Sequence, residues 1–135
     1  MFRMTSALIL VGKKMPENRR DDMCTKNELN SILQKLTQIY RSVYGENLVQ
    51  VILYGSYARG DYHTDSDVDV VAIVHGDRKT LQQQLKKVWD SSCELELEYD
   101  TILSPTVIPY EEFKQYQTVL PYYRNISQEG VVISA

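Results

Sequence analysis

Two aspartates stand two residues apart in this chain, Asp67 and Asp69, and a Gly55-Ser56 pair precedes them by ten intervening residues. On an extended strand, side chains at positions i and i+2 point to the same face, so these carboxylates would lie side by side. Proteins hold hard cations such as Mg²⁺ through one or two carboxylates together with substrate phosphates. A turn at Gly55-Ser56 would offer those phosphates backbone N–H groups and a hydroxyl. The spacing therefore predicts a metal-dependent site for nucleotidyl transfer.

The position of Asp69 supports this interpretation. It stands between Val68 and Val70, in a run of residues that is otherwise apolar. A carboxylate in such surroundings is costly unless it is paired or binds a metal ion. A divalent cation would convert that cost into a contribution to binding. The alternative is that Asp67 and Asp69 are both surface turn residues.

Three further side chains near the motif are candidates for polar roles. Arg59 follows Ser56 by about one helical turn, and its guanidinium could contact a triphosphate and stabilise the charge that leaves with pyrophosphate. The alternative for Arg59 is a solvated turn residue. Ser66 could orient the Asp67 carboxylate or contact phosphate, or it could cap the turn. His63 is expected to face solvent rather than to act as a base.

The two halves of the motif are expected at the ends of two strands. Residues 48–54 and 68–74 are apolar and rich in β-branched side chains, which is typical of buried strands. Before them, apolar residues recur at helical spacing over 26–44, and Gly45 ends that pattern as glycine often ends a helix. A second helix is expected over 79–98.

The rest of the chain completes an α/β pattern. Apolar residues alternate from about residue 94, which leaves open that the second helix changes to a strand there. Residues 101–108 predict a third strand, and Pro105 within it indicates a sheet edge or a bulge. A short helix is expected over 110–119 and a further helical turn over 121–128.

Composition bounds the classes of function. The chain has 135 residues, enough for one domain with its own core, and its formal net charge is −3. That charge argues against strong general binding of nucleic acid. The apolar stretch at residues 7–11 is shorter than a membrane span or a typical signal-peptide core. We therefore expect a cytoplasmic protein without membrane contact.

The domain itself is expected over residues 25–135. Residues 1–24 have the character of an N-terminal extension, because their polar, charge-mixed part shows no periodicity. The extension could be disordered, or residues 6–11 could form a small strand. A start site placed too early is a third explanation, since Met23 stands just before the first helix.

The spacing Gly-Ser, ten residues, Asp-x-Asp resembles the signature of the DNA polymerase β-type nucleotidyltransferase superfamily. The fuller sequences Gly55-Ser-Tyr-Ala-Arg-Gly60 and Ser66-Asp-Val-Asp-Val70 are similar to its minimal nucleotidyltransferase (MNT) branch. Short members of that branch are often encoded beside a HEPN-type ribonuclease toxin and act as its antitoxin. The likeness extends over residues 25–135 and includes the tail Pro121-Tyr-Tyr-Arg-Asn-Ile126.

The resemblance implies a fold and a set of site residues. The fold would be a small mixed β-sheet with helices packed mainly on one face. Gly55 and Ser56 would hold the triphosphate of ATP, and Asp67 and Asp69 would bind Mg²⁺ or Mn²⁺.

The family's third carboxylate, which activates the acceptor hydroxyl, usually lies on the next core strand. No acid occurs over residues 101–108. Asp100, at the mouth of that strand, is the nearest candidate, with Glu98 and Glu96 behind it.

The resemblance also implies an activity, transfer of AMP from ATP to a hydroxyl of a partner protein. The expected acceptor is a tyrosine of a HEPN-type toxin, which the modification would inactivate. Two alternatives stay open. One keeps the chemistry and changes the acceptor to a small molecule or an RNA end. The other is a module that neutralises its partner by contact alone, which the unplaced third acid favours and the aspartate pair opposes.

Overall fold

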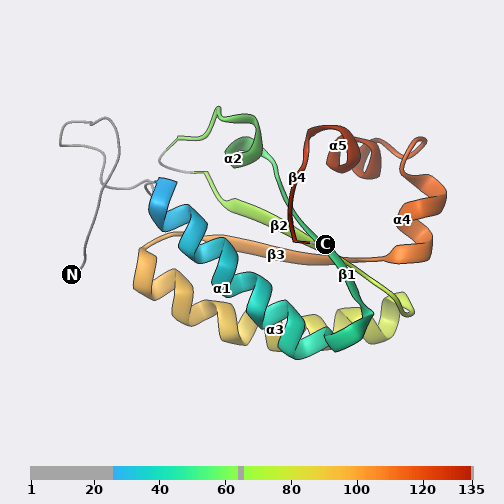
Figure 1. Cartoon of the computed structure of the whole chain (residues 1–135), viewed down its shortest axis with the longest axis horizontal. Helices are drawn as coiled ribbons and strands as arrows, with labels where there is room; N and C mark the ends of the chain where they lie inside the picture. The colour runs from blue at the N-terminus through green and yellow to red at the C-terminus, as the bar shows by residue number, and fades with distance from the viewer. Residues whose placement is uncertain (1–25, 64–65, 135) are drawn as a thin grey trace.

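The computed structural model describes residues 26–63 and 66–134, and the predicted extension over residues 1–24 lies outside these described residues. The elements are α1 (Lys26–Tyr44), the 3₁₀ turn η1 (Gly45–Asn47), β1 (Leu48–Tyr54), α2 (Ser56–Arg59), β2 (Val68–Val74), α3 (Arg78–Tyr99), β3 (Leu103–Pro109), α4 (Tyr110–Tyr116), α5 (Pro121–Glu129) and β4 (Val131–Ser134). Helices and strands alternate along the chain as far as α4, which is followed by a further helix, α5 (Figure 1).

The strands form one mixed sheet in the order β3-β2-β1-β4. β1 is antiparallel to both β2 and β4, whereas β2 and β3 are parallel and are joined through α3. A parallel pair needs such a crossover connection, usually a helix. Pro105 lies on β3, at an edge of the sheet, where its missing N–H does not break a ladder on both sides. The mixed sheet and the edge position of this strand confirm the sequence prediction.

The two faces of the sheet are covered differently. The long helices α1 and α3 lie side by side on one face, and α4 and α5 lie on the other (Figure 1). The short helix α2 follows β1 and contributes Tyr57 to the core beneath α1 and α3. Along β2, Val68, Val70, Ala72 and Val74 point into the larger core with α1 and α3. Val71 and Ile73 point to the opposite face, where they pack in a smaller cluster with residues of α4 and α5. Alternation places Asp69 on this second face, beyond the end of that cluster.

Helix α3 runs without interruption to Tyr99, so the alternative of a strand from residue 94 is wrong. Helical spacing buries Leu95 and leaves Leu97 85% exposed, whereas a strand would bring both to one face. The Asp77 side chain caps the helix start by accepting a hydrogen bond from Thr80 N at 3.0 Å. Within the ranges that the structure describes, neither α3 nor another helix is both long and apolar enough to cross a membrane.

Tyr40 joins α1 to the sheet through a buried hydroxyl. The side chain is fully buried, and its hydroxyl donates to Thr106 O at 2.8 Å and lies 3.3 Å from Val70 O. Burial raises the pKa of Tyr40 well above its ordinary value, so the hydroxyl keeps its proton. We therefore expect this hydrogen bond to contribute to stability.

Tyr40→Phe should lower the free energy of unfolding by about 1–3 kcal/mol, because a buried carbonyl loses its donor. Urea unfolding followed by circular dichroism measures the change. Tyr116→Phe, at a more exposed position on α4, is the matched control and should change the value by less than about 0.5 kcal/mol. Equal stability of Tyr40→Phe and the wild type would show that the ring alone holds α1 in place.

Candidate active site

Gly55 connects β1 to α2 in a conformation that requires glycine. Its φ is 76° and its ψ is −156°, a region that residues with a side chain rarely occupy. A Cβ built at Gly55 would also collide with Oδ2 of the Asp69 carboxylate. Glycine is thus required both for the turn and for the close approach of the carboxylate. The two halves of the sequence motif meet at this contact.

Helix α2 is a single turn that starts beside this contact. The N–H groups of Ala58 and Arg59 both donate to Gly55 O at 3.1 Å. Gly60, with a φ of 87°, closes the turn, and its N–H donates to Ser56 O at 2.8 Å. The first N–H groups of a helix have no acceptor within the helix. The backbone N–H and the hydroxyl of Ser56 therefore lie at the start of the turn, next to the carboxylate of Asp69.

Asp67 stands directly before β2, and Asp69 is the second residue of that strand. Asp69 is half-buried and pairs in register with Tyr54 of β1 on one side and with Ser104 of β3 on the other. Burial raises the pKa of Asp69, the negative charge of Asp67 raises it further, and the charge of Arg59 opposes both. The pair therefore places two like charges together where solvation is reduced. A cation between them would relieve this repulsion.

Ser104 lies on β3, the strand on which the resemblance implies a third carboxylate, and it is the register partner of Asp69. Its Oγ donates a hydrogen bond to Asp67 Oδ2 at 3.2 Å. Thr106 follows on the same face, and its Oγ1 donates to Val70 O at 3.3 Å. The strand thus brings one neutral hydroxyl, that of Ser104, to the acidic pair. Sequence reasoning missed Ser104. In a strand over residues 101–108 every second side chain points to one face, and this alternation could have indicated that Ser104 faces the aspartates.

Asp100 does not join the acidic pair in a metal-binding group. It is exposed, has a φ of 51° and ends α3. Within residues 26–63 and 66–134, no three side chains of His, Cys, Asp or Glu gather so that they could hold a metal ion. Glu98 forms an ion pair with Lys35 at 3.1 Å, and Glu96 accepts from Leu103 N at 2.8 Å. Substitution of Asp100 tests whether this side chain acts in catalysis.

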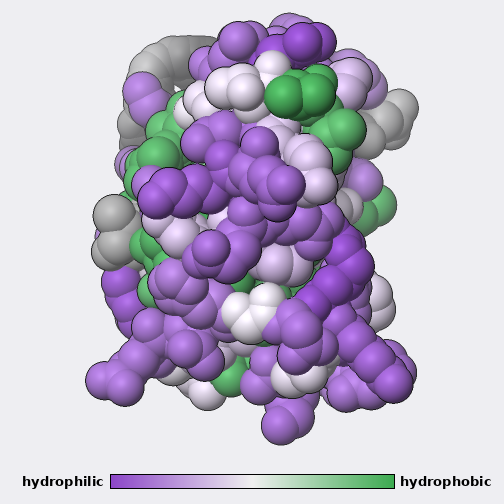
Figure 2. Space-filling view, turned by 90° about the vertical axis from the view of Figure 1, so that its right-hand side faces the viewer, coloured by the Kyte–Doolittle hydropathy of each residue, from purple (hydrophilic) through white to green (hydrophobic). Residues whose placement is uncertain are grey.

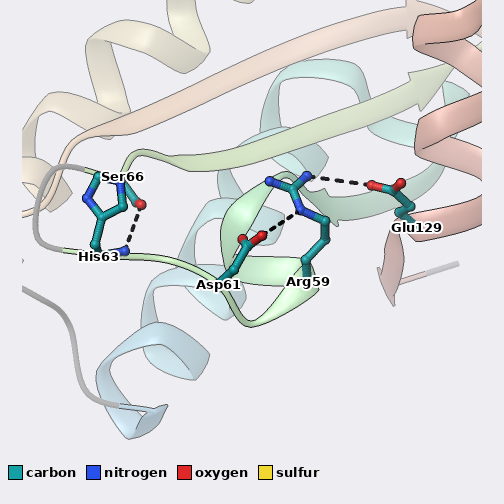
Figure 3. A network of polar contacts seen from close by, with 5 residues as sticks. All are labelled: Arg59, Asp61, His63, Ser66 and Glu129. Carbon is teal, nitrogen blue, oxygen red and sulfur yellow. Dashed lines mark hydrogen bonds and ion pairs between the residues drawn. The ribbon is translucent and has the colours of Figure 1, made fainter.

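Arg59 projects from the end of α2 and connects it to α5. Its Nε lies 3.2 Å from Asp61 Oδ2, and its Nη1 lies 3.5 Å from Glu129 Oε1 (Figure 3). Ion pairs between such exposed side chains contribute little to stability. The guanidinium can therefore exchange these partners for a phosphate at little cost. Sequence reasoning did not anticipate Glu129, which is remote along the chain.

Ser66 closes the loop that leads into β2. Its Oγ accepts a hydrogen bond from His63 N at 2.9 Å, and its own N–H donates to His63 O at 2.9 Å (Figure 3). These contacts fit the alternative in which Ser66 caps the turn before Asp67. Contact between Ser66 and phosphate stays a prediction. His63 is exposed, as expected from the sequence.

Two tyrosines stand next to the acidic pair. The hydroxyls of Tyr54 and Tyr122 share a hydrogen bond of 2.9 Å, and their rings meet edge to face with centroids 5.9 Å apart. Burial, and then the hydrogen bond with Tyr122, raises the pKa of Tyr54. Tyr54 therefore stays neutral and cannot serve as a base near pH 7. Sequence analysis missed this pair because it depends on where α5 packs.

The donors at this site fit a hard divalent cation. Asp67 and Asp69 offer carboxylate oxygens from one face of a strand, and Ser56 offers donors to a phosphate beside them. The glycine at position 55 lets the Asp69 carboxylate lie against the backbone, in space that a Cβ would take. Mg²⁺ and Mn²⁺ both prefer oxygen ligands of this kind.

Comparison with known protein families agrees with this chemistry. A family model described as a nucleotidyltransferase domain matches residues 17–133 of the chain. Two proteins of Methanocaldococcus jannaschii, both named as proposed protein adenylyltransferases, are similar in sequence. MJ0141 is 35% identical over 80 residues, which are 59% of this chain and 79% of the relative. MJ0604 is 28% identical over 101 residues, which are 75% of this chain and 93% of the relative.

Two solved structures are similar to this chain at lower sequence identity. A crystal structure of a toxin-antitoxin with AMP-PNP has a TM-score of 0.47 at 18% identity and covers 76% of this chain and 70% of that one. A proposed nucleotidyltransferase from Sulfolobus solfataricus has a TM-score of 0.46 at 20% identity, with 81% and 87% covered. Because both TM-scores are below 0.5, nothing about function follows from these two structures.

Gly55→Ala should weaken binding of Mg²⁺-ATP by at least about tenfold, because the new Cβ displaces the Asp69 carboxylate. It should also lower the free energy of unfolding by about 1–3 kcal/mol through backbone strain. Thermophoresis with a fluorescent ATP analogue measures the first effect, and urea unfolding measures the second.

Gly60→Ala is the matched control for this substitution. Gly60 also has a positive φ, but a Cβ there meets nothing within 4 Å. The control should cost about 1–2 kcal/mol of stability from the left-handed backbone alone and leave nucleotide affinity unchanged. Equal loss of affinity in both variants would contradict the special role of the contact between Gly55 and Asp69.

Proposed function

This chain belongs to the nucleotidyltransferase domain family, and we propose that it transfers AMP from ATP to a hydroxyl group of a partner protein. The observation that carries the proposal is the contact of Gly55 with the Asp69 carboxylate, because it joins a phosphate-facing turn and an acidic pair in one site. The names of the M. jannaschii relatives support a protein as the acceptor.

Each residue of the site has a separate role toward the metal ion or the triphosphate. A bound Mg²⁺ or Mn²⁺ ion would supply positive charge to the triphosphate. Asp67 and Asp69 hold that ion through their carboxylate oxygens. Ser56 donates hydrogen bonds to the phosphates that leave, and Arg59 turns from its exposed ion pairs toward them.

In the reaction, the acceptor oxygen forms a bond to the α-phosphorus of ATP. The bond from that phosphorus to the bridging oxygen of the β-phosphate breaks, and its electron pair leaves with pyrophosphate. The acceptor's proton passes to solvent or to a group of the acceptor protein. The donors at Ser56 and Arg59 stabilise the charge that accumulates on the leaving group.

The acceptor that we propose is a tyrosine of a HEPN-type ribonuclease toxin, so that the protein acts as an antitoxin in the cytoplasm. The likeness of residues 55–70 to MNT proteins supports this partner. Exposed apolar side chains next to the site, among them Tyr122 of α5 and Val131 of β4, are available to a partner. By contrast, the end of the molecule on the side of α4 is largely hydrophilic, with small apolar patches (Figure 2).

A second candidate function is neutralisation of the toxin by contact alone. None of the residues Leu103–Pro109 is acidic, so β3 cannot supply the carboxylate that would activate an acceptor. This observation favours a protein that binds its partner without modifying it. If the protein modifies its partner, substitution of either aspartate should abolish the effect on that partner. If it acts by contact alone, inhibition of the partner should be unchanged in both variants.

Asp67→Asn and Asp69→Asn should each lower AMP transfer by more than about a hundredfold, because changes that only reorient a metal ligand already cost about 10–100-fold. The chain is incubated with Mg²⁺, the protein encoded beside it, and ATP labelled on either the α- or the γ-phosphate. Label from the α-phosphate should appear on the partner, and γ-label should leave as pyrophosphate. Asp90→Asn, at an exposed position on α3, is the control and should retain full activity.

Other outcomes of this experiment separate the alternatives. Inhibition of the partner without label, unchanged in the two aspartate variants, would establish neutralisation by contact. Transfer of α-label to tRNA or to an aminoglycoside in place of the partner would replace the protein acceptor by an RNA end or a small molecule.

Asp100→Asn tests the remaining candidate for a third carboxylate. The substitution should change AMP transfer by less than about twofold, because Asp100 is exposed and asparagine tolerates its left-handed backbone. The same labelling assay measures the rate. A loss as large as that of Asp69→Asn would make Asp100 a catalytic residue.

A further inference from the structure

We propose that this site binds one divalent ion with its nucleotide, not two, because the strands on both sides of the aspartate pair present neutral hydroxyls to it and no carboxylate. This inference rests on the proposed function, since it specifies how the same site holds metal and ATP. It concerns the residues that surround the aspartate pair and what they can coordinate.

The strand register fixes what lies beside the acidic pair. Tyr54 of β1 and Ser104 of β3 are the neighbours of Asp69 on its two sides. Both carry neutral hydroxyls. The Tyr54 hydroxyl is engaged with Tyr122, and the Ser104 hydroxyl donates to Asp67 Oδ2 at 3.2 Å. Neither neighbouring strand therefore adds negative charge to the site.

The charge of the site suits a single ion. Two divalent ions in a two-metal site lie about 3.5–4 Å apart, and their mutual repulsion is four times that of two unit charges at that distance. Asp67 and Asp69 offer two negative charges, and no third acidic, His or Cys side chain joins them within the described ranges. One ion held by two carboxylates and the triphosphate matches the usual way in which proteins bind Mg²⁺.

Ser104 also orients one of the two carboxylates. By donating to one oxygen of Asp67 it fixes the orientation of that carboxylate, as groups behind metal ligands commonly do. It is therefore a positioning residue. Because β3 provides no base, an acceptor hydroxyl that loses its proton readily is favoured, such as the phenol of tyrosine with an ordinary pKa of about 10.

Equilibrium dialysis with Mn²⁺ and AMP-PNP tests the stoichiometry directly. The wild-type chain should retain one Mn²⁺ for each AMP-PNP, and Ser104→Asp should retain two. Ser104→Asn, which has the shape of the aspartate without its charge, is the matched control and should retain one. Circular dichroism checks that each variant is folded, and Mn²⁺ with AMP-PNP should raise the Tm of Ser104→Asp more than that of Ser104→Asn.

The possible results separate the two proposals. Two ions for each nucleotide in the wild type, or one in folded Ser104→Asp, would overturn the inference and leave the proposed function intact. Retention of neither Mn²⁺ nor AMP-PNP by the wild type would overturn both. If Ser104→Asp does not fold, the wild type and Ser104→Asn decide, because two ions in either would contradict a single-ion site.

Discussion

The close approach of the Asp69 carboxylate to the backbone of Gly55 is the constraint on which the site depends. It requires a residue without a side chain at the end of β1, and it requires β1 and β2 to pair in the register that sets Tyr54 opposite Asp69. A shift of β2 by one residue would turn Asp69 into the core. This register brings the turn at Gly55 and Ser56 to the pair of carboxylates.

The rest of the fold stabilises the strand beside which the two like charges lie. The carboxylates lie on one face of β2, while Val68 and Val70 on the other face are fully buried against α1 and α3. Burial of these valines holds the strand in place although its opposite face carries two like charges. The smaller apolar cluster under α4 and α5 contains Val71 and Ile73, beyond the acidic pair, so that the pair itself stays only partly buried. Repulsion at the site is thus confined to one end of one strand.

Much of this organisation could be predicted from the sequence, because it depends on local patterns. Alternation and apolar runs located β1 and β2, and Pro105 indicated the edge position of β3. The roles of Ser104 and Glu129 could not be found in this way. The first depends on the register between β2 and β3, and the second depends on the tertiary placement of α5, whose Glu129 forms an ion pair with Arg59 of α2. Such contacts join segments that are far apart in the sequence, and no local sequence pattern predicts that they meet.

The central claim is that the glycine-serine turn and the aspartate pair form one site for a nucleotide and a divalent ion. Isothermal titration calorimetry of the wild-type chain with AMP-PNP tests it most directly, once with Mg²⁺ and once with EDTA. The account predicts saturable binding of one nucleotide per chain with Mg²⁺ and a large loss of affinity in EDTA. Equal affinity under both conditions, or no binding under either, would contradict it.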